Sequence, residues 1–251
     1  MLIKTLFVSD IHLGSRHSSV KEFLEFLSLV KENPPERIYI IGDFIDGWKL
    51  KRNWHWTDDN NKVIRKLLGF LRRGTEIYYI AGNHDEFMRD FLDDFSLFDM
   101  GSIHLGNEFV YETVKGQKLL VIHGDYFDLI SKYAKWVSKL GDIGYETFLR
   151  LNSVFQYFRK HLGFRHWSLS KAVKTNVKKA VNFISNFEEC LIKYSKEKGC
   201  DGCVCGHIHT PDYKVLPNGF IYANSGDWVE SCTAFYEDFS GEFHIYRHPL
   251  V

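Results

Sequence analysis

Short hydrophobic runs alternate with stretches of helical spacing through the first third of the chain. Residues 2–8, 37–41 and 76–81 are rich in β-branched and aromatic residues, which is typical of buried strands. Between them, residues 20–31 and 60–73 repeat apolar residues every three or four positions, as one face of a helix does. This strand–helix alternation predicts parallel strands joined by right-handed crossovers.

The strand pattern changes further along the chain. A hairpin is predicted around Lys115-Gly116, and Pro-Asn-Gly at 217–219 and Ser-Gly at 240–241 mark later turns. The strands expected in this part are 109–113, 118–122, 202–205, 213–216, 220–223, 233–236 and 243–246. We therefore predict an α/β fold in which two sheets pack face to face as a sandwich, with helices outside.

A long helical stretch interrupts this order. Residues 128–198 have apolar stripes at helical spacing and no strand pattern. Residues 131–180 hold eleven Lys and Arg against only Asp142 and Glu146, although the whole chain balances 32 basic with 32 acidic residues. We expect one domain over residues 1–251, with a basic helical lid inserted at about 128–198.

The composition indicates the class of protein and the compartment in which it works. A chain of 251 residues with 45% hydrophobic and 25% charged residues is ordinary for a globular protein. Its five cysteines are odd in number and lack framework spacing, which favours a reducing compartment. No run reaches the ~18 apolar residues of a membrane span. We expect a cytoplasmic protein that could still rest on a membrane surface.

Polar motifs follow the hydrophobic runs in a fixed order. They are Asp10-Ile11-His12, Gly42-Asp43-Phe44-Ile45-Asp46, Gly82-Asn83-His84-Asp85, His123-Gly124-Asp125 and Gly206-His207-Ile208-His209. Ligands of parallel sheets gather beyond the carboxyl ends of the strands, where the first three motifs fall. A lone Asp-x-His or Gly-Asp pair is usually a turn, but the ordered set predicts a site for two divalent metal ions.

A two-metal site needs one ligand that bridges the ions and several others that hold each one. Asp43 is the natural bridge, and Gly42 before it relieves crowding at the strand end. The other candidate ligands are Asp10, His12, Asn83, His123, His207 and His209. Nitrogen and oxygen ligands without thiolate admit manganese, iron or zinc.

The charge balance suits hydrolysis of a phosphate ester or diphosphate. Two divalent ions exceed the negative charge of Asp10 and Asp43, which leaves room for an anionic phosphate and a bridging hydroxide. His84 is predicted to reach the phosphate or the leaving group as an acid or charge stabiliser. Three carboxylates that closely follow ligands are expected to orient them: Asp46, Asp85 and Asp125.

The ordered set resembles that of the calcineurin-like metallophosphoesterases over nearly the whole chain. This resemblance implies a two-sheet sandwich flanked by helices. It also implies that one metal is held by Asp10, His12, Asp43 and His209, and that the other is held by Asp43, Asn83, His123 and His207.

Within that family the chain looks like the UDP-2,3-diacylglucosamine hydrolases of lipid A synthesis. Gly-Asp-Phe-Ile-Asp-Gly-Trp at 42–48, the helical insertion and Gly226-Asp227-Trp228 are similar to theirs. The resemblance implies manganese-dependent cleavage of the diphosphate, which yields UMP and 2,3-diacylglucosamine 1-phosphate. The best-studied members have arginine at the position of His84.

The basic insert leaves several roles open. It could line an acyl chamber and contact substrate phosphates together with Asn83 and His84, through Lys171, Lys174, Lys178 and Lys179. It could instead rest on an anionic membrane, follow a nucleic-acid backbone, or only pack on the core. A non-catalytic scaffold is disfavoured because no ligand position is missing.

Overall fold

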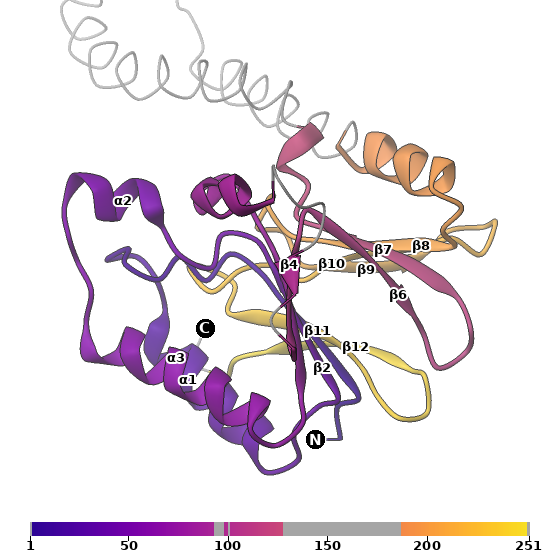
Figure 1. The fold of residues 1–251 in the computed structure, drawn as a ribbon. Coiled ribbons are helices and arrows are strands. Elements are labelled where there is room, and N and C mark those ends of the chain that lie inside the picture. Colours follow the sequence, from indigo (N-terminus) through magenta and orange to yellow (C-terminus); the bar gives the residue numbers. More distant parts are fainter. Residues whose placement is uncertain (1, 93–97, 100, 128–186, 250–251) are drawn as a thin grey trace, which may run out of the picture. The chain divides into compact units, whose positions relative to one another are not determined.

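The computed structural model describes residues 2–92, 98–99, 101–127 and 187–249 of the chain (Figure 1). Two compact units are present, one formed by Met1–Asp125 with Leu191–Val251 and the other by Tyr126–Cys190. Most of the predicted lid, including its four lysines, lies outside the described residues. Its described end is helical over residues 187–197. The single domain with an inserted lid stays a prediction.

The larger sheet contains the parallel strands expected from the N-terminal pattern. β1 (Thr5–Val8), β2 (Arg37–Ile41) and β3 (Glu76–Ile80) are adjacent and parallel. Four further strands complete a seven-stranded sheet in the order β12-β11-β1-β2-β3-β5-β4. They are β4 (Phe98–Asp99), β5 (Ile103–Gly106), β11 (Thr233–Glu237) and β12 (Phe243–Arg247).

The smaller sheet has five strands in the order β6-β7-β8-β10-β9. The predicted hairpin is confirmed, since β6 (Glu108–Glu112) pairs antiparallel with β7 (Lys118–Ile122). β8 (Gly202–Cys205) lies parallel to β7 and to β10 (Ile221–Asn224), and β9 (Asp212–Val215) closes one edge. β7 and β8 therefore end at the same edge of this sheet.

Both faces of the central strands are buried, which explains their nearly continuous hydrophobic sequences. Leu6 and Ile40 point into the cluster that also contains side chains of the helices. Phe7 and Tyr39 point to the opposite face, where their rings stack at 5.1 Å and join residues of the smaller sheet. The predicted face-to-face packing of two sheets is confirmed.

Two amphipathic helices cover the outer face of the larger sheet (Figure 1). α1 (Val20–Lys31) has the predicted bounds, and α3 (Asp58–Leu71) begins and ends two residues earlier than predicted. The pattern did not predict the six-residue helix α2 (Gly47–Arg52), because it begins at a glycine and has no apolar stripe. Asp46 caps α2 by accepting a 2.9 Å hydrogen bond from the Lys49 N–H.

The state of the cysteines and the character of the helices can also be read from the described residues. All five cysteines are free thiols, and Cys203 and Cys205 are buried in β8. Among the described helices, none combines the length and the apolar character needed to cross a bilayer.

Candidate metal centre

The five motifs begin just beyond the carboxyl ends of β1, β2, β3, β7 and β8. Several of their residues adopt the left-handed backbone region, which costs a non-glycine residue of the order of 1–3 kcal/mol. Six described non-glycine residues have this conformation, and five of them are candidate ligands: Asp10, His12, Asp43, His207 and His209. Backbone strain in the described residues is therefore concentrated at this site.

Two glycines allow the backbone to approach the candidate ligands. Gly42 has φ +71°, and a Cβ there would lie 2.3 Å from Nδ1 of His123. A Cβ at Gly206 would lie 2.6 Å from Oδ2 of Asp10. Such distances are far below any tolerable contact, so only glycine permits the ligands to crowd together here.

Asp10 lies at the centre of a first group of candidate ligands. Its Oδ1 is 3.2 Å from Nε2 of His209 and 4.0 Å from Nε2 of His12. Its other oxygen accepts a 2.9 Å hydrogen bond from the His207 backbone N–H. Ligand atoms of Asp10, His12 and His209 all lie within 4.8 Å of one another, close enough to share one ion.

Asp43 connects this group with a second one. Its Oδ2 is 3.8 Å from Nε2 of His12, and its Oδ1 is 3.5 Å from Nε2 of His123. The His207 ring lies 5.0 Å from that of His123. Asp43 thus lies between imidazoles of both predicted ligand sets, as a bridging ligand would.

Four buried polar atoms at the site have no hydrogen-bond partner in good geometry. They are Asp10 Oδ1, His12 Nε2, Asn83 Oδ1 and His123 Nε2. A buried polar atom without a partner costs about 1–3 kcal/mol, so its retention calls for an explanation. Divalent metal ions would use these carboxylate, amide and imidazole lone pairs. The donor set therefore fits a pair of divalent ions.

His123 is held in one orientation. Its Nδ1–H donates to the Ile41 carbonyl oxygen at 2.8 Å, which leaves Nε2 as the nitrogen that faces Asp43. A backbone carbonyl on the far nitrogen is how proteins fix the tautomer of a metal-binding histidine.

His84 lies beside the candidate ligands and is partly open to solvent. Its Nδ1 is 3.0 Å from Oδ1 of Asp46, and its ring centroid is 4.6 Å from that of His12. The Trp48 ring covers another side, with centroids 4.3 Å apart. Asp46 also approaches Nδ1 of His12, at 3.6 Å. Asp46 therefore contacts a candidate ligand and the candidate proton donor together.

The acids and histidines of the site share protons strongly in the absence of metal. Burial by itself would lower the pKa of His123, but the Asp43 carboxylate raises it to about 10. Burial would likewise lower the pKa of His209, which Asp10 raises to about 9. Burial opposes ionisation of Asp43, yet His123 holds the pKa of Asp43 far below its usual range. Bound cations would replace these protons.

Asp85 joins the loops that follow β2 and β3. Its carboxylate accepts hydrogen bonds from the Phe44 N–H at 2.9 Å and from the Gly82 N–H at 2.6 Å. The Tyr79 hydroxyl donates to Oδ2 at 2.5 Å. Since both loops carry candidate ligands, Asp85 sets the spacing between Asp43 and Asn83.

Asp125 connects another pair of loops at the site, those that follow β3 and β7. Arg89 contacts both its carboxylate oxygens, at 2.9 and 2.8 Å, and donates to the Ala81 carbonyl oxygen at 2.9 Å. The loops after β3 and β7 are thereby tied together.

The Gly226-Asp227-Trp228 segment lies against the first motif. The backbone N–H of Trp228 donates to the Asp10 carbonyl oxygen at 3.0 Å, and the Trp228 indole is buried against Phe23 and Phe26. Asn224 donates to the Gly206 carbonyl oxygen at 2.8 Å. Sequence reasoning missed Asn224, Tyr79 and Arg89, because each resembles an ordinary strand or helix residue. Trp48, whose ring lies beside His84, was indicated in the sequence only by the Gly-Asp-Phe-Ile-Asp-Gly-Trp segment at 42–48.

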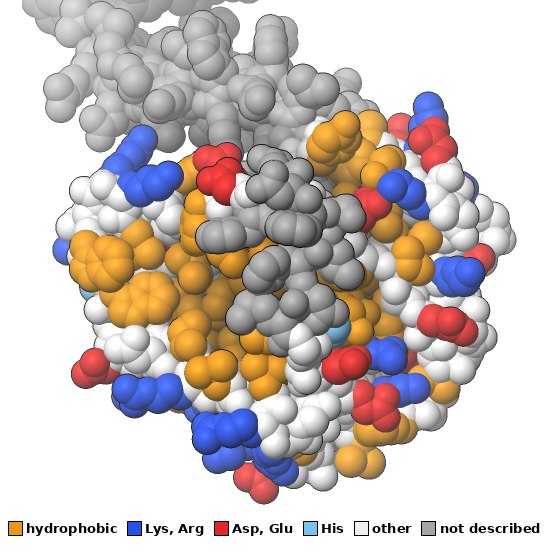
Figure 2. Space-filling model, in the orientation of Figure 1, with side chains coloured by type: hydrophobic (Ala, Val, Ile, Leu, Met, Phe, Trp, Pro, Cys, Tyr) orange, Lys and Arg blue, Asp and Glu red, His pale blue; other side chains and the backbone are white. Residues whose placement is uncertain are grey.

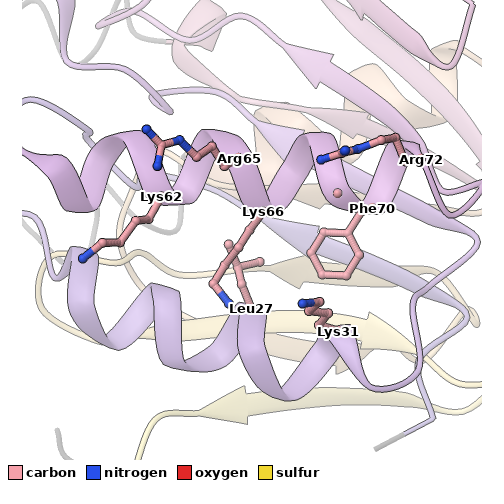
Figure 3. A pocket seen from close by; sticks show the side chains of 8 residues that line it. Leu27, Lys31, Lys62, Arg65, Lys66, Phe70 and Arg72 are labelled. Carbon is pink, nitrogen blue, oxygen red and sulfur yellow. The ribbon is translucent and has the colours of Figure 1, made fainter.

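A cavity of about 370 Å³ lies elsewhere, between α1 and α3 (Figure 3). Its floor is formed by Leu27 and Phe70, and its rim is cationic. The basic residues that line it are Lys31, Lys62, Arg65, Lys66 and Arg72. None of the candidate ligands lines it, so this cavity is separate from the metal centre.

The chain is similar to several known proteins. A sequence model of the family described as Calcineurin-like phosphoesterase matches residues 3–211. A UDP-2,3-diacylglucosamine hydrolase of Psychromonas ingrahamii is 32% identical over 239 residues, which is 90% of each chain. The protein of that name from Wigglesworthia glossinidia brevipalpis is 27% identical over 91% of this chain and 88% of its own. A dimetal phosphatase structure from Danio rerio has 9% identity and a TM-score of 0.46, covering 98% of this chain and 99% of that one.

Proposed function

Since this chain belongs to the calcineurin-like phosphoesterase family, we propose that it hydrolyses the diphosphate of UDP-2,3-diacylglucosamine to UMP and 2,3-diacylglucosamine 1-phosphate in lipid A synthesis. The relatives with that name match nine-tenths of the chain. The proposal for this protein combines the activity for which those relatives are named with the chemistry of its own site.

The observation that carries the proposal is the set of four orphaned buried atoms around Asp43. One ion would be held by Asp10, His12, Asp43 and His209, and the other by Asp43, Asn83, His123 and His207. When bound, the two ions would supply positive charge to the phosphate oxygens and lower the pKa of the attacking water.

The chain's own residues position the reactants and move a proton. Asp46 holds Nδ1 of His84, so Nε2 is the nitrogen available to the substrate. His84 would donate a hydrogen bond or a proton from Nε2 to the phosphate or leaving oxygen. Trp48 limits rotation of the imidazole by covering one side. Asp85 and Asp125 keep the loops of the site at fixed spacing.

The finer parts of the proposal concern the metal, the lid and the location. Manganese is the expected ion, with iron and zinc as alternatives for the same donor set. Asn83 and His84, with Lys171, Lys174, Lys178 and Lys179 of the lid, would contact the phosphates. Five free cysteines support a reducing cytoplasmic location, and the lipid substrate supports peripheral contact with the inner face of the cell membrane through the basic lid.

The test is a comparison of substrates with purified, metal-loaded protein. Detergent-dispersed UDP-2,3-diacylglucosamine is compared with a bis-phosphodiester, a phosphomonoester and single-stranded DNA, each with manganese, iron or zinc. Release of UMP together with the lipid 1-phosphate is the expected result. Faster turnover of DNA or of a simple phosphodiester would assign the site to another substrate of this family.

Asp43→Ala and His123→Ala serve as inactive controls. If hydrolysis persists unchanged in both purified variants, the dimetal mechanism is wrong. If the wild-type protein binds metal but hydrolyses none of the substrates, the proposed substrate is wrong.

A further inference from the structure

Helix α2 and the loop after it carry an exposed aromatic residue beside a group of cations. Trp54 is 72% exposed, more than any other large hydrophobic side chain described in the unit formed by Met1–Asp125 and Leu191–Val251. An indole offers about 150–250 Å² of mostly apolar surface, so its exposure to water is unfavourable. We name the residues Lys49, Lys51, Arg52 and Trp54 the α2 surface.

The exposed Trp54 indole lies beside a second tryptophan that is fixed in the fold. Trp56 packs against the main hydrophobic cluster, and its Nε1–H donates to Asn61 at 2.8 Å. The Trp54 ring lies 6.4 Å from the Trp56 ring at an interplanar angle of 34°. The Trp54 ring is therefore held in place by the anchored Trp56 ring. Because its side chain is already partly ordered, Trp54 would lose little conformational entropy on binding a partner.

The cations of the α2 surface have no acidic partner among the described residues. Lys49, Lys51 and Arg52 are exposed, and none lies within ion-pair distance of a described carboxylate. One cation would suffice to interact favourably with the C-terminal carbonyl groups of so short a helix. All three cations nevertheless lie in its last turn. Figure 2 shows hydrophobic side chains next to Lys and Arg side chains on the side where α2 lies in Figure 1.

The α2 surface is joined directly to the metal centre. The helix starts after Asp46, which contacts His12 and His84, and its Trp48 covers His84. A Cβ at Gly14 would lie 2.7 Å from Leu50, so the helix packs closely on the turn after the first motif. Whatever binds the outer side of α2 is therefore brought close to the site.

We propose that the α2 surface docks the protein on an anionic phospholipid bilayer, with Trp54 in the headgroup layer and Lys49, Lys51 and Arg52 on the lipid phosphates. This inference rests on the proposed function, because a diacyl substrate resides in a membrane. Tryptophan is enriched at the membrane interface, and clustered cations next to it favour anionic lipid.

The arrangement favours a bilayer over single-stranded nucleic acid. A nucleic-acid groove needs successive aromatic rings on which bases stack along a cationic track. Here a single ring is widely exposed, since Trp56 is turned into the core cluster and its N–H is occupied. One exposed indole with exposed cations on the same short segment suits a flat charged interface.

The experiment measures sedimentation of the full-length protein with substrate-free vesicles of phosphatidylcholine, with and without phosphatidylglycerol. We expect binding only to the anionic vesicles. Since each cation at an anionic surface is worth about a fivefold change in partition, Lys51→Glu with Arg52→Glu should weaken binding by about thirtyfold or more. Trp54→Ala should weaken it by about tenfold through lost apolar contact.

Two matched controls test whether the effect belongs to this surface. Phe239→Ala removes another ring, which is 53% exposed, and should leave binding unchanged. Lys31→Glu with Arg72→Glu reverses two cations of the separate α1–α3 cavity and should weaken binding much less. Equal loss in the controls, or wild-type binding by both α2 variants, would overturn the proposal. Loss of binding to single-stranded DNA with vesicle binding intact would assign the surface to nucleic acid instead.

The outcome is separable from the proposed function. Vesicle binding is measured without substrate, and turnover is measured in detergent without vesicles. The α2 variants should keep wild-type melting temperatures, because the altered side chains are exposed, and should keep wild-type turnover in detergent. Absence of turnover in the wild-type protein would refute the proposed function alone.

Discussion

The hydroxyl of Tyr79 donates a 2.5 Å hydrogen bond to Oδ2 of Asp85, and both side chains are buried. The same carboxylate accepts backbone N–H groups from the loops after β2 and β3. A residue inside a strand thus controls the spacing of two loops that carry candidate metal ligands.

Tyr79→Phe should therefore destabilise the protein and weaken metal binding. Loss of a buried hydrogen bond to a charged group costs about 1.5–3 kcal/mol, which chemical denaturation of the metal-free protein would measure. Tyr78→Phe is the matched control, because its hydroxyl donates to the partly exposed Glu76 at 3.1 Å. Similar destabilisation by the two variants would contradict the role assigned to Asp85.

Gly42→Ala should abolish metal binding. A Cβ there would lie 2.3 Å from Nδ1 of His123, so this ring would have to leave its bond to the Ile41 carbonyl oxygen. Gly116→Ala is the control, since Gly116 has φ +78° with nothing within 4 Å of its Cβ. That change should cost only the left-handed backbone penalty of about 1–2 kcal/mol. Metal content by elemental analysis separates the two, and normal content in Gly42→Ala would refute the crowding argument.

The metal-free protein should lose stability as the pH rises from about 6.5 to about 10. The pKa values of His123 and His209 are raised in the folded state to about 10 and about 9, above the unfolded value of 6.5. Their contribution is complete below the unfolded pKa and disappears as the pH rises through the folded values. Melting temperatures in chelator across this range test the sign. A flat or rising profile would show that these imidazoles are not paired with Asp43 and Asp10.

His84→Ala should lower kcat while the protein keeps its metal. Loss of a positioned proton donor typically costs about 10²–10⁴ in rate, and His84 belongs to neither predicted ligand set. His123→Ala is the contrasting variant and should lose metal as well as activity. Parallel measurements of kcat and metal content distinguish the roles, and metal loss in His84→Ala would make His84 a ligand.

The sequence was most informative where local pattern and chemistry coincide. The bounds of β2, α1, β7 and β8 match the predicted ones, because apolar periodicity over a buried segment is a strong signal. The structure adds α2 and β5, which have six and four residues. Elements of that length depend on contacts with the rest of the fold, such as the capping bond from Lys49 to Asp46.

By itself, the sequence determined the two-sheet fold through its pattern of hydrophobic runs, and the candidate ligands through the polar motifs that follow those runs. Only the tertiary structure decided how the ligands are held. The closeness of Gly42 to His123 and the hydrogen bond from the Phe44 N–H to Asp85 join positions far apart in the chain, and Asp10 and Asp43 adopt a left-handed backbone at the same strand ends. Sequence patterns record neighbours along the chain, whereas distances between strand ends depend on how both sheets pack.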